Sequence, residues 1–282
     1  MEKPVKTQPT LSDDELLNQL RFCVRCLMAE RPGNEDARQL LSELNTMEFS
    51  TVWTMFRALV NTRKPLPADP DLLRIQDQVL QELIARDGVE DVANFVSTPY
   101  DDRISLWMGD ITRLKIDAIV NAANSSLTGC WQPGHHCIDN AIHTFAGIQL
   151  RCECAELMER QGGEEPTGSA KVTPAYNLPA SYIIHTVGPV ANGQPTPEHR
   201  RQLASCYESC LEAARSAGIR SLAFCCVSTG VFGFLQEEAA SLAVRTVRNW
   251  LEVHATTNIQ VVFNVFTQQD LEYYQRALSV WG

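Results

Sequence analysis

The chain has 282 residues, of which 44% are hydrophobic, and it carries a net charge of −10 at pH 7. This length predicts about two domains, and the apolar fraction is sufficient to fill a folded core. The acidic balance excludes broad electrostatic binding to nucleic acid, so a bound phosphate would have to be held by local backbone dipoles.

The sequence also bears on location. No apolar run approaches the roughly 18–20 residues of a membrane span, so we expect no contact with the membrane interior. The first ten residues lack the apolar centre of a secretory signal, and we therefore expect a cytoplasmic protein. The 10 cysteines are then expected to be mostly reduced thiols and not a disulfide framework.

Residues 1–96 show helical patterning and no candidate chemistry. Ser12 and Glu15 form a capping box in front of the first apolar helical pattern. Gly88 is predicted to end the fourth helix. We expect a small all-helical N-terminal domain that acts as a cap or a docking module.

Residues 97–282 alternate between strand and helix patterns. The predicted strands are 103–108, 116–121, 170–174, 182–187, 221–227 and 259–266. The predicted helices are 139–161, 197–217, 237–254 and 268–280. This order predicts an α/β fold with a mainly parallel central sheet covered by helices on both faces. Ligands in such folds bind beyond the carboxyl ends of the strands, so the loops there are candidate binding loops.

One loop has the spacing of a metal site, Cys130-x4-His135-x-Cys137. Thiolate and imidazole ligands suit Zn²⁺, and three of them leave one coordination position open, as a catalytic zinc requires. We prefer His135 over His136 because residues i and i+2 of an extended segment share a face. Cys137 precedes a helix, whose dipole favours the thiolate. A chance cluster and a structural zinc with a fourth protein ligand are the alternatives.

A glycine-containing loop follows the predicted strand 221–227. Its residues are Ser228, Thr229, Gly230, Val231, Phe232, Gly233 and Phe234. Glycines permit positive φ angles and let successive N–H groups approach an anion, which predicts a diphosphate cradle. The alternative is a tight structural turn.

Polar residues close two other strands and begin a helix. Asp110 could accept from an exocyclic amine such as that of adenine, or could begin a turn. Asn121 and Asn124, three residues apart, suit recognition of a sugar, although either could also be a turn former. Asp139 stands where a helix starts, so it is either an N-cap or a chemically active carboxylate. His185, in the middle of a strand, is expected to be a core residue.

Five runs of residues carry a resemblance to a known family. They are 109–112, 117–124, 137–143, 182–189 and 228–233. Together they resemble the macrodomain, an ADP-ribose-binding module, over about residues 100–282. MacroD-type hydrolases have a glycine-rich run before the catalytic aspartate, and here the segment from Cys130 to Cys137 replaces it. That departure resembles the zinc-dependent macrodomains, which also carry a helical N-terminal extension.

The resemblance implies an arrangement and a set of roles. It implies a three-layer α/β/α macrodomain with a mainly parallel mixed central sheet at residues 97–282, with a helical extension at residues 1–96. ADP-ribose would bind through Asp110 and the Ile111 backbone at adenine, through Asn121 and Asn124 near the ribose, and through residues 228–234 at the diphosphate. Zn²⁺ would be held by Cys130, His135 and Cys137. Asp139 and Asn124 would be catalytic.

The implied activity is zinc-dependent hydrolysis of the C1″ bond between mono-ADP-ribose and a protein side chain. This bond is glycosidic in type, with an oxocarbenium-like transition state. Two thiolates weaken the Lewis acidity of the ion, which favours substrate positioning over activation of water. Implied partners are ADP-ribose, a mono-ADP-ribosylated protein and a sirtuin-type ADP-ribosyltransferase. The alternatives are a reader that binds ADP-ribose without cleaving it, and an O-acetyl-ADP-ribose deacetylase.

Overall fold

The computed structural model describes residues 8–31 and 35–280. Most of the N-terminal stretch considered for a secretory signal lies outside these residues. Among the described helices, none is both long and apolar enough to cross a membrane. The cytoplasmic location stays a prediction.

The first part of the chain is helical, as predicted. It contains α1 (Asp13–Ala29), α2 (Glu35–Glu43), a 3₁₀ turn η1 (Leu44–Thr46), α3 (Phe49–Asn61) and α4 (Pro70–Asp87). The capping box is confirmed, since Ser12 Oγ accepts from the N–H of Glu15 and the Glu15 carboxylate accepts from the N–H of Ser12. Gly88 ends α4 with φ of +86°. Leu20, Phe56 and Val79 are among the buried side chains that form the core of this part.

The helical pattern ends earlier than residue 96, which corrects the prediction. After Asp87 the chain forms β1 (Glu90–Asp91), η2 (Val92–Asn94) and β2 (Ser97–Thr98). β1 pairs in parallel with β4 (Leu114–Lys115), and β2 pairs antiparallel with β3 (Asp101–Met108). Strands of two residues carry no readable periodicity, and their partners lie later in the chain.

A seven-stranded sheet forms the centre of the second part, in the order β2-β3-β9-β8-β5-β7-β6. Its remaining strands are β5 (Ala118–Ala123), β6 (Ala170–Pro174), β7 (Tyr182–Val187), β8 (Ser221–Phe224) and β9 (Gln260–Val265). The pairs between β3 and β7 are parallel, whereas β2 and β6 at the two edges run antiparallel to their neighbours. The prediction of a mainly parallel mixed sheet is confirmed.

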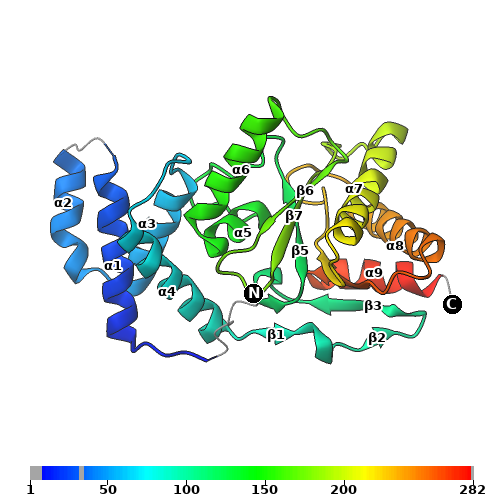
Figure 1. The fold of residues 1–282 in the computed structure, drawn as a ribbon, viewed down its shortest axis with the longest axis horizontal. Coiled ribbons are helices and arrows are strands. Elements are labelled where there is room, and N and C mark those ends of the chain that lie inside the picture. Colours follow the sequence, from blue (N-terminus) through cyan, green and yellow to red (C-terminus); the bar gives the residue numbers. More distant parts are fainter. Residues whose placement is uncertain (1–7, 32–34, 281–282) are drawn as a thin grey trace.

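Helices cover both faces of the sheet (Figure 1). α7 (Pro197–Ser216), α8 (Gln236–Val253) and α9 (Gln268–Ser279) pack side by side on one face. α5 (Ile138–Ala146) and α6 (Ile148–Gln161) lie on the other face, where α3 and α4 pack against α5. This is the expected three-layer α/β/α arrangement, with the helical extension beside the α5–α6 layer.

The helix predicted over residues 139–161 is divided into α5 and α6 by Gly147. Gly147 has φ of +100°, and a Cβ at this position would lie 2.5 Å from Gln149 Oε1 and 2.8 Å from Gln76 Nε2. The prediction of one continuous helix is therefore wrong. The backbone turns here at φ of +100° and ψ of 169°, a conformation essentially restricted to glycine, and Gln76 of α4 accepts a hydrogen bond from the N–H of Ile148 after the turn.

Candidate active site

The carboxyl ends of the parallel strands meet at one edge of the sheet, and most of the predicted site residues follow these ends. Asn121 is the exception, because β5 continues to Ala123 and places it inside the strand, not at its predicted end. Large apolar side chains are exposed there at the end of β3 and in the segments after β7, β8 and β9. They include Met108, Val190, Val231 and Phe266. Phe266 was missed by the sequence analysis, although an aromatic residue directly after the last strand was a usable signal. Exposed apolar surface at this edge suits the flat face of a nucleobase.

Asp110 caps the 3₁₀ turn η3 (Ile111–Arg113), which was the structural alternative for this residue. Its Oδ1 accepts from the N–H of Thr112 at 2.9 Å and from Thr112 Oγ1 at 2.7 Å. Within the described part of the chain, no hydrogen bond involves Oδ2. Capping and acceptance from a ligand amine are therefore compatible. The side chain of Ile111 is buried, so only its backbone can face a ligand.

The loop after β8 is tightly bent. Ser228 has φ of +66°, in the left-handed region that non-glycine residues rarely adopt. The N–H of Phe234 donates to Ser228 O, and the N–H of Gly233 donates to Gly230 O, both at 2.9 Å. The Thr229 hydroxyl donates to Cys226 O at 3.0 Å. Phe234 is buried in the core and anchors the loop, so its predicted contact with ADP-ribose does not fit this structure.

The same loop presents unused N–H groups. Those of Gly230, Val231 and Phe232 donate to no acceptor among the described residues. The carbonyl of Phe232 accepts from the N–H groups of Ala191 and Asn192, which fixes the peptide orientation. Three successive free amides are the donor arrangement that holds a phosphate without a basic side chain.

Asp139 is not the helix cap. α5 begins at Ile138, and the side chain of Cys137 caps it by accepting from the N–H of Asn140 at 3.4 Å. The Asp139 carboxylate instead accepts from Asn121 Nδ2 at 2.8 Å and lies 3.4 Å from Asn124 Nδ2. Burial raises the pKa of Asp139 to about 6, while the Asn121 hydrogen bond and the charge of Arg151 act in the opposite direction.

Asn121 is fully buried, so its amide supports other groups and has no surface for a ligand. Besides Asp139, its Nδ2 contacts His185 Nδ1 at 3.1 Å. The other ring nitrogen of His185 lies 2.9 Å from Thr173 Oγ1. A series of polar contacts thus links Thr173 of β6, His185 of β7 and Asn121 of β5 to Asp139. These contacts fix the orientation of the carboxylate. The predicted direct contact of Asn121 with ADP-ribose is replaced by this supporting position.

Asn124 shapes the loop that leads to Cys130. Its Nδ2 donates to Gly129 O at 2.9 Å, and its Oδ1 accepts from the N–H of Ser126 at 3.1 Å. The side chain is only half-buried and lies beside Asp139. It is therefore the one of the two predicted amides that can still meet a ligand.

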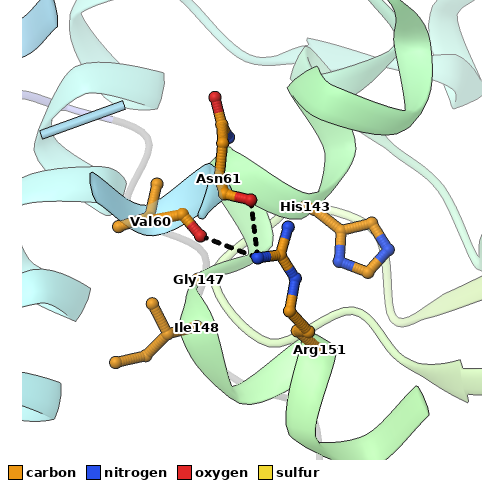
Figure 2. A pocket seen from close by; sticks show the side chains of 6 residues that line it. All are labelled: Val60, Asn61, His143, Gly147, Ile148 and Arg151. Carbon is orange, nitrogen blue, oxygen red and sulfur yellow. Dashed lines mark hydrogen bonds between the residues drawn. The ribbon is translucent and has the colours of Figure 1, made fainter. Parts of the chain in front are cut away.

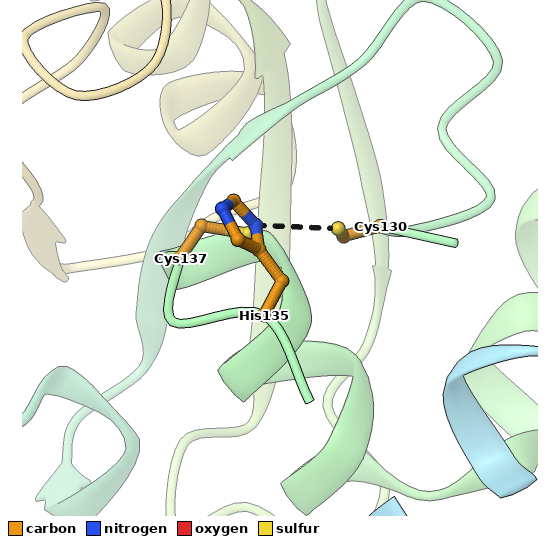
Figure 3. A group of neighbouring side chains, drawn as sticks. All are labelled: Cys130, His135 and Cys137. Carbon is orange, nitrogen blue, oxygen red and sulfur yellow. Dashed lines mark hydrogen bonds between the residues drawn. The ribbon is translucent and has the colours of Figure 1, made fainter. Parts of the chain in front are cut away.

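Cys130, His135 and Cys137 converge at the start of α5 (Figure 3). Cys130 Sγ lies 3.5 Å from His135 Nδ1, and the potential ligand atoms of the three residues all lie within 4.8 Å of one another. A tetrahedral zinc ion holds neighbouring sulfur and nitrogen ligands about 3.5 Å apart. The donor set and its spacing therefore fit zinc, and His135, not His136, supplies the imidazole.

The helix N-terminus alone does not produce the thiolate predicted at Cys137. Burial raises the pKa of the Cys137 thiol to about 12, and the neighbouring Cys130 acts in the same direction. The N–H of Asn140 lowers it, but by less. A cation bound between the two sulfur atoms would offset the free-energy cost of forming a buried thiolate, because metal coordination favours the deprotonated thiol.

A second group of potential metal ligands, His143, Cys154 and His185, is completely buried. Both ring nitrogens of His185 are already hydrogen-bonded to protein. Burial and the neighbouring His185 lower the pKa of His143 well below its ordinary value, so its 3.6 Å contact with Asp139 joins a neutral ring to the carboxyl. We interpret this group as packed polar core, as expected for His185.

Comparison with known proteins identifies the family. Residues 120–243 match the Macro domain family model. The chain is 50% identical over 227 residues to a protein-ADP-ribose hydrolase from Treponema medium, and the match covers 80% of this chain and 87% of that protein. The chain belongs to the macrodomain family of protein-ADP-ribose hydrolases. This membership confirms the predicted fold and the predicted enzyme class.

Two further relatives extend the comparison. The macrodomain chain is 41% identical over 290 residues to a probable bifunctional ADP-ribose hydrolase/ADP-ribosyltransferase from Fusarium oxysporum f. sp. cubense, covering 97% of this chain and 47% of that protein. It also resembles the crystal structure of a Trypanosoma brucei macrodomain in complex with ADP-ribose. That match has a TM-score of 0.61 and 31% identity, and it covers 79% of this chain and 94% of the other.

Proposed function

We propose that this macrodomain hydrolyses the C1″ bond of mono-ADP-ribose attached to a protein side chain, and that a zinc ion belongs to its active site. One observation carries the proposal. The cluster of Cys130, His135 and Cys137 ends two residues before Asp139, at the sheet edge that also presents the free amides after β8. A module that only binds ADP-ribose needs no metal-ligand cluster beside its carboxylate.

The geometry supports one orientation of ADP-ribose. Adenine would stack on Phe266 and donate to Asp110, because β9 and β3 are neighbours and both residues follow their strand ends. The diphosphate would accept from the amides of Gly230, Val231 and Phe232. The distal ribose would then reach Asn124 and Asp139, with the metal cluster beyond them.

Asp139 is the proposed base for the reaction. Asn121 holds one carboxylate oxygen and Asn124 lies beside the other, so the group is oriented before substrate binds. The water oxygen forms a bond to C1″, its proton moves to Asp139, and the bond from C1″ to the acceptor oxygen breaks. A bound zinc ion would supply positive charge for orienting the distal ribose or the acceptor carbonyl.

We also infer a functional pairing with an ADP-ribosyltransferase that supplies the modified protein. The name of the Fusarium relative joins a hydrolase and a transferase in one protein. That the transferase is of the sirtuin type remains a proposal from the resemblance.

Metal removal tests the zinc component. We expect purified protein to contain about one zinc per chain, and chelation or Cys137→Ala to slow release of ADP-ribose from a mono-ADP-ribosylated protein by about 100-fold. Adding zinc back should restore the chelated wild type. Cys152→Ala, a matched cysteine outside the cluster, should retain activity.

Two results would contradict this proposal in different ways. Unchanged release by zinc-free Cys137→Ala would remove zinc from the mechanism and leave the hydrolase. If the zinc-loaded wild type binds ADP-ribose tightly but releases none from modified protein, the protein would be a reader that binds ADP-ribose without cleaving it.

A further inference from the structure

The last residue of α3 directly contacts the loop of residues 130–137, which carries the three potential metal ligands and is called the metal loop below. Asn61 is 1% exposed, and its Oδ1 accepts from the N–H of Gly134 at 3.0 Å. Its Nδ2 donates to Thr144 Oγ1 at 3.1 Å. One amide side chain of the helical extension therefore joins the turn before His135 to helix α5.

Arg57, one turn earlier on α3, reaches the same loop. Its Nη2 donates to Asn140 Oδ1 at 3.0 Å and to the carbonyl of His135 at 3.4 Å. Asn140 in turn donates from its side chain to Gln132 O at 3.2 Å, and from its backbone to Cys137 Sγ. Arg57 is thus linked to two of the three potential ligands.

Arg151 of α6 connects the remaining ligand to α3. Its Nη1 donates to the carbonyls of Val60 and Asn61 at 3.1 and 2.7 Å (Figure 2). It also donates to the carbonyl of Arg63 at 2.9 Å. The carbonyls of Val60 and Asn61 belong to the negative end of the α3 dipole, which suits a buried cation. Arg151 Nη2 donates to Cys130 O at 3.4 Å, and the guanidinium stacks over the Trp131 ring at 4.2 Å from its centroid.

The loop is therefore fixed to α3 at both of its ends. Arg151 joins α3 to Cys130, while Asn61 and Arg57 join it to the segment of His135 and Cys137. None of these three side chains is among the potential metal ligands. They bind backbone groups of the metal loop and the side chain of Asn140. Side chains that hold ligands in place typically contribute 10- to 100-fold to metal affinity.

We propose that the helical extension is a structural part of the metal site, with Arg57, Asn61 and Arg151 as positioning residues. They bring the two thiols and the imidazole together before an ion arrives, which reduces the ordering cost of binding. This inference rests on the proposed zinc site. It assigns the extension a task inside the enzyme, in place of the predicted cap or docking module.

Metal affinity, measured without turnover, tests the inference. Full-length metal-free protein would be titrated with Zn²⁺ against a chromophoric chelator, and with Co²⁺ while the absorption bands of the bound ion are recorded. We expect Asn61→Ala and Arg57→Ala to weaken Zn²⁺ binding by about 10- to 100-fold and to change the Co²⁺ spectrum. Arg57→Lys, which keeps the positive charge and a donor nitrogen, should recover part of the Zn²⁺ affinity.

A matched control separates positioning from general stability. Gln81 of α4 donates to Asn177 Oδ1 at 2.9 Å, also between the extension and the macrodomain but away from the loop. Gln81→Ala should bind Zn²⁺ like the wild type, and an equal loss of affinity in this variant would overturn the inference. If Asn61→Ala does not fold, the Arg57 variants decide, because Arg57 is only half-buried.

The outcomes also separate this inference from the proposed function. If folded Arg57→Ala and Asn61→Ala bind Zn²⁺ as tightly as the wild type and give its Co²⁺ spectrum, the positioning role is overturned. The proposed zinc site would stand. A wild type that takes up neither metal would overturn the zinc site and this inference together, but not the hydrolase.

Discussion

Asp139 shows how one position decides between two roles. The sequence places it at the start of a helix, where capping and catalysis are both open. The structure puts the cap at Cys137 and turns the Asp139 carboxylate toward Asn121 and Asn124. A shift of two residues in the helix start separates these roles, and sequence patterns do not locate helix ends to that precision.

Replacing this carboxylate should remove the base and preserve the shape of the site. We expect Asp139→Asn to slow ADP-ribose release from modified protein by about 10²- to 10⁴-fold, the usual contribution of a general base. The affinity for free ADP-ribose, measured by calorimetry, should change by less than about tenfold. Asp71→Asn, at an exposed acid of α4, is the control. A release rate for Asp139→Asn close to that of the wild type would assign the base role to another group.

Other site residues differ in how far the sequence could reveal them. The spacing of Cys130, His135 and Cys137 is local, so the pattern alone predicted a cluster that the structure also contains. Arg57 and Asn61 lie more than 70 residues before the loop that they contact. No local pattern predicts such a contact, because it depends on how α3 packs against α5.

Among the secondary-structure elements, those with strong local patterns were predicted well. The strand over residues 182–187 was predicted with the bounds of β7, because it is a short apolar run with a clear start and end. The junction of α5 and α6 was missed, since Gly147 lies inside an apparently continuous helical pattern. The backbone at Gly147 has φ of +100° and ψ of 169°, and the next residue donates its N–H to Gln76, a residue of α4 that lies far away in sequence.

Gly147→Ala tests that explanation. Gly147 has φ of +100° and ψ of 169°, a region that is essentially restricted to glycine, so an alanine there should lower the free energy of unfolding by roughly 3 kcal/mol. Gly162→Ala is the comparison, because Gly162 has φ of 74° and ψ of 22°, in the left-handed region that other residues can adopt, and it should cost about 1 kcal/mol. Urea unfolding of both variants measures the difference. Equal costs would show that the backbone at the junction does not require glycine.

In the whole molecule, the helical extension and the macrodomain share apolar surface and polar contacts. Ile148 of α6 belongs to the apolar cluster formed by α1, α3 and α4. Gln76 Oε1 accepts from the N–H of Ile148 at 3.1 Å, and Arg151 binds the end of α3. We therefore expect the described parts of the chain to unfold together, so that a buried group in one part affects the stability of the whole.

The buried histidines make that stability depend on pH. Burial lowers the pKa of His185 from 6.5 to about 3, so below about pH 6.5 the unfolded chain binds a proton that the native protein does not. The free energy of unfolding should fall by up to about 1.4 kcal/mol per pH unit as the pH drops from 6.5 toward 3. Asp139, whose pKa is raised to about 6, acts in the opposite direction between about pH 4 and 6.

Comparison with His185→Gln isolates this contribution. The advantage of the wild type over the variant in urea unfolding should be largest at pH 7 and should shrink at pH 6 and pH 5. Parallel pH profiles for the two proteins would mean that His185 is not held neutral in the native state.

The antiparallel strands at the edges of the sheet have a consequence for association between molecules. β2 is only two residues long, and β6 carries Lys171 and ends at Pro174. Short strands, charge and proline are features that hinder the addition of a foreign strand to a sheet edge. In the described part of the chain, the central sheet therefore offers little template for aggregation, even though most of its strands are strongly apolar.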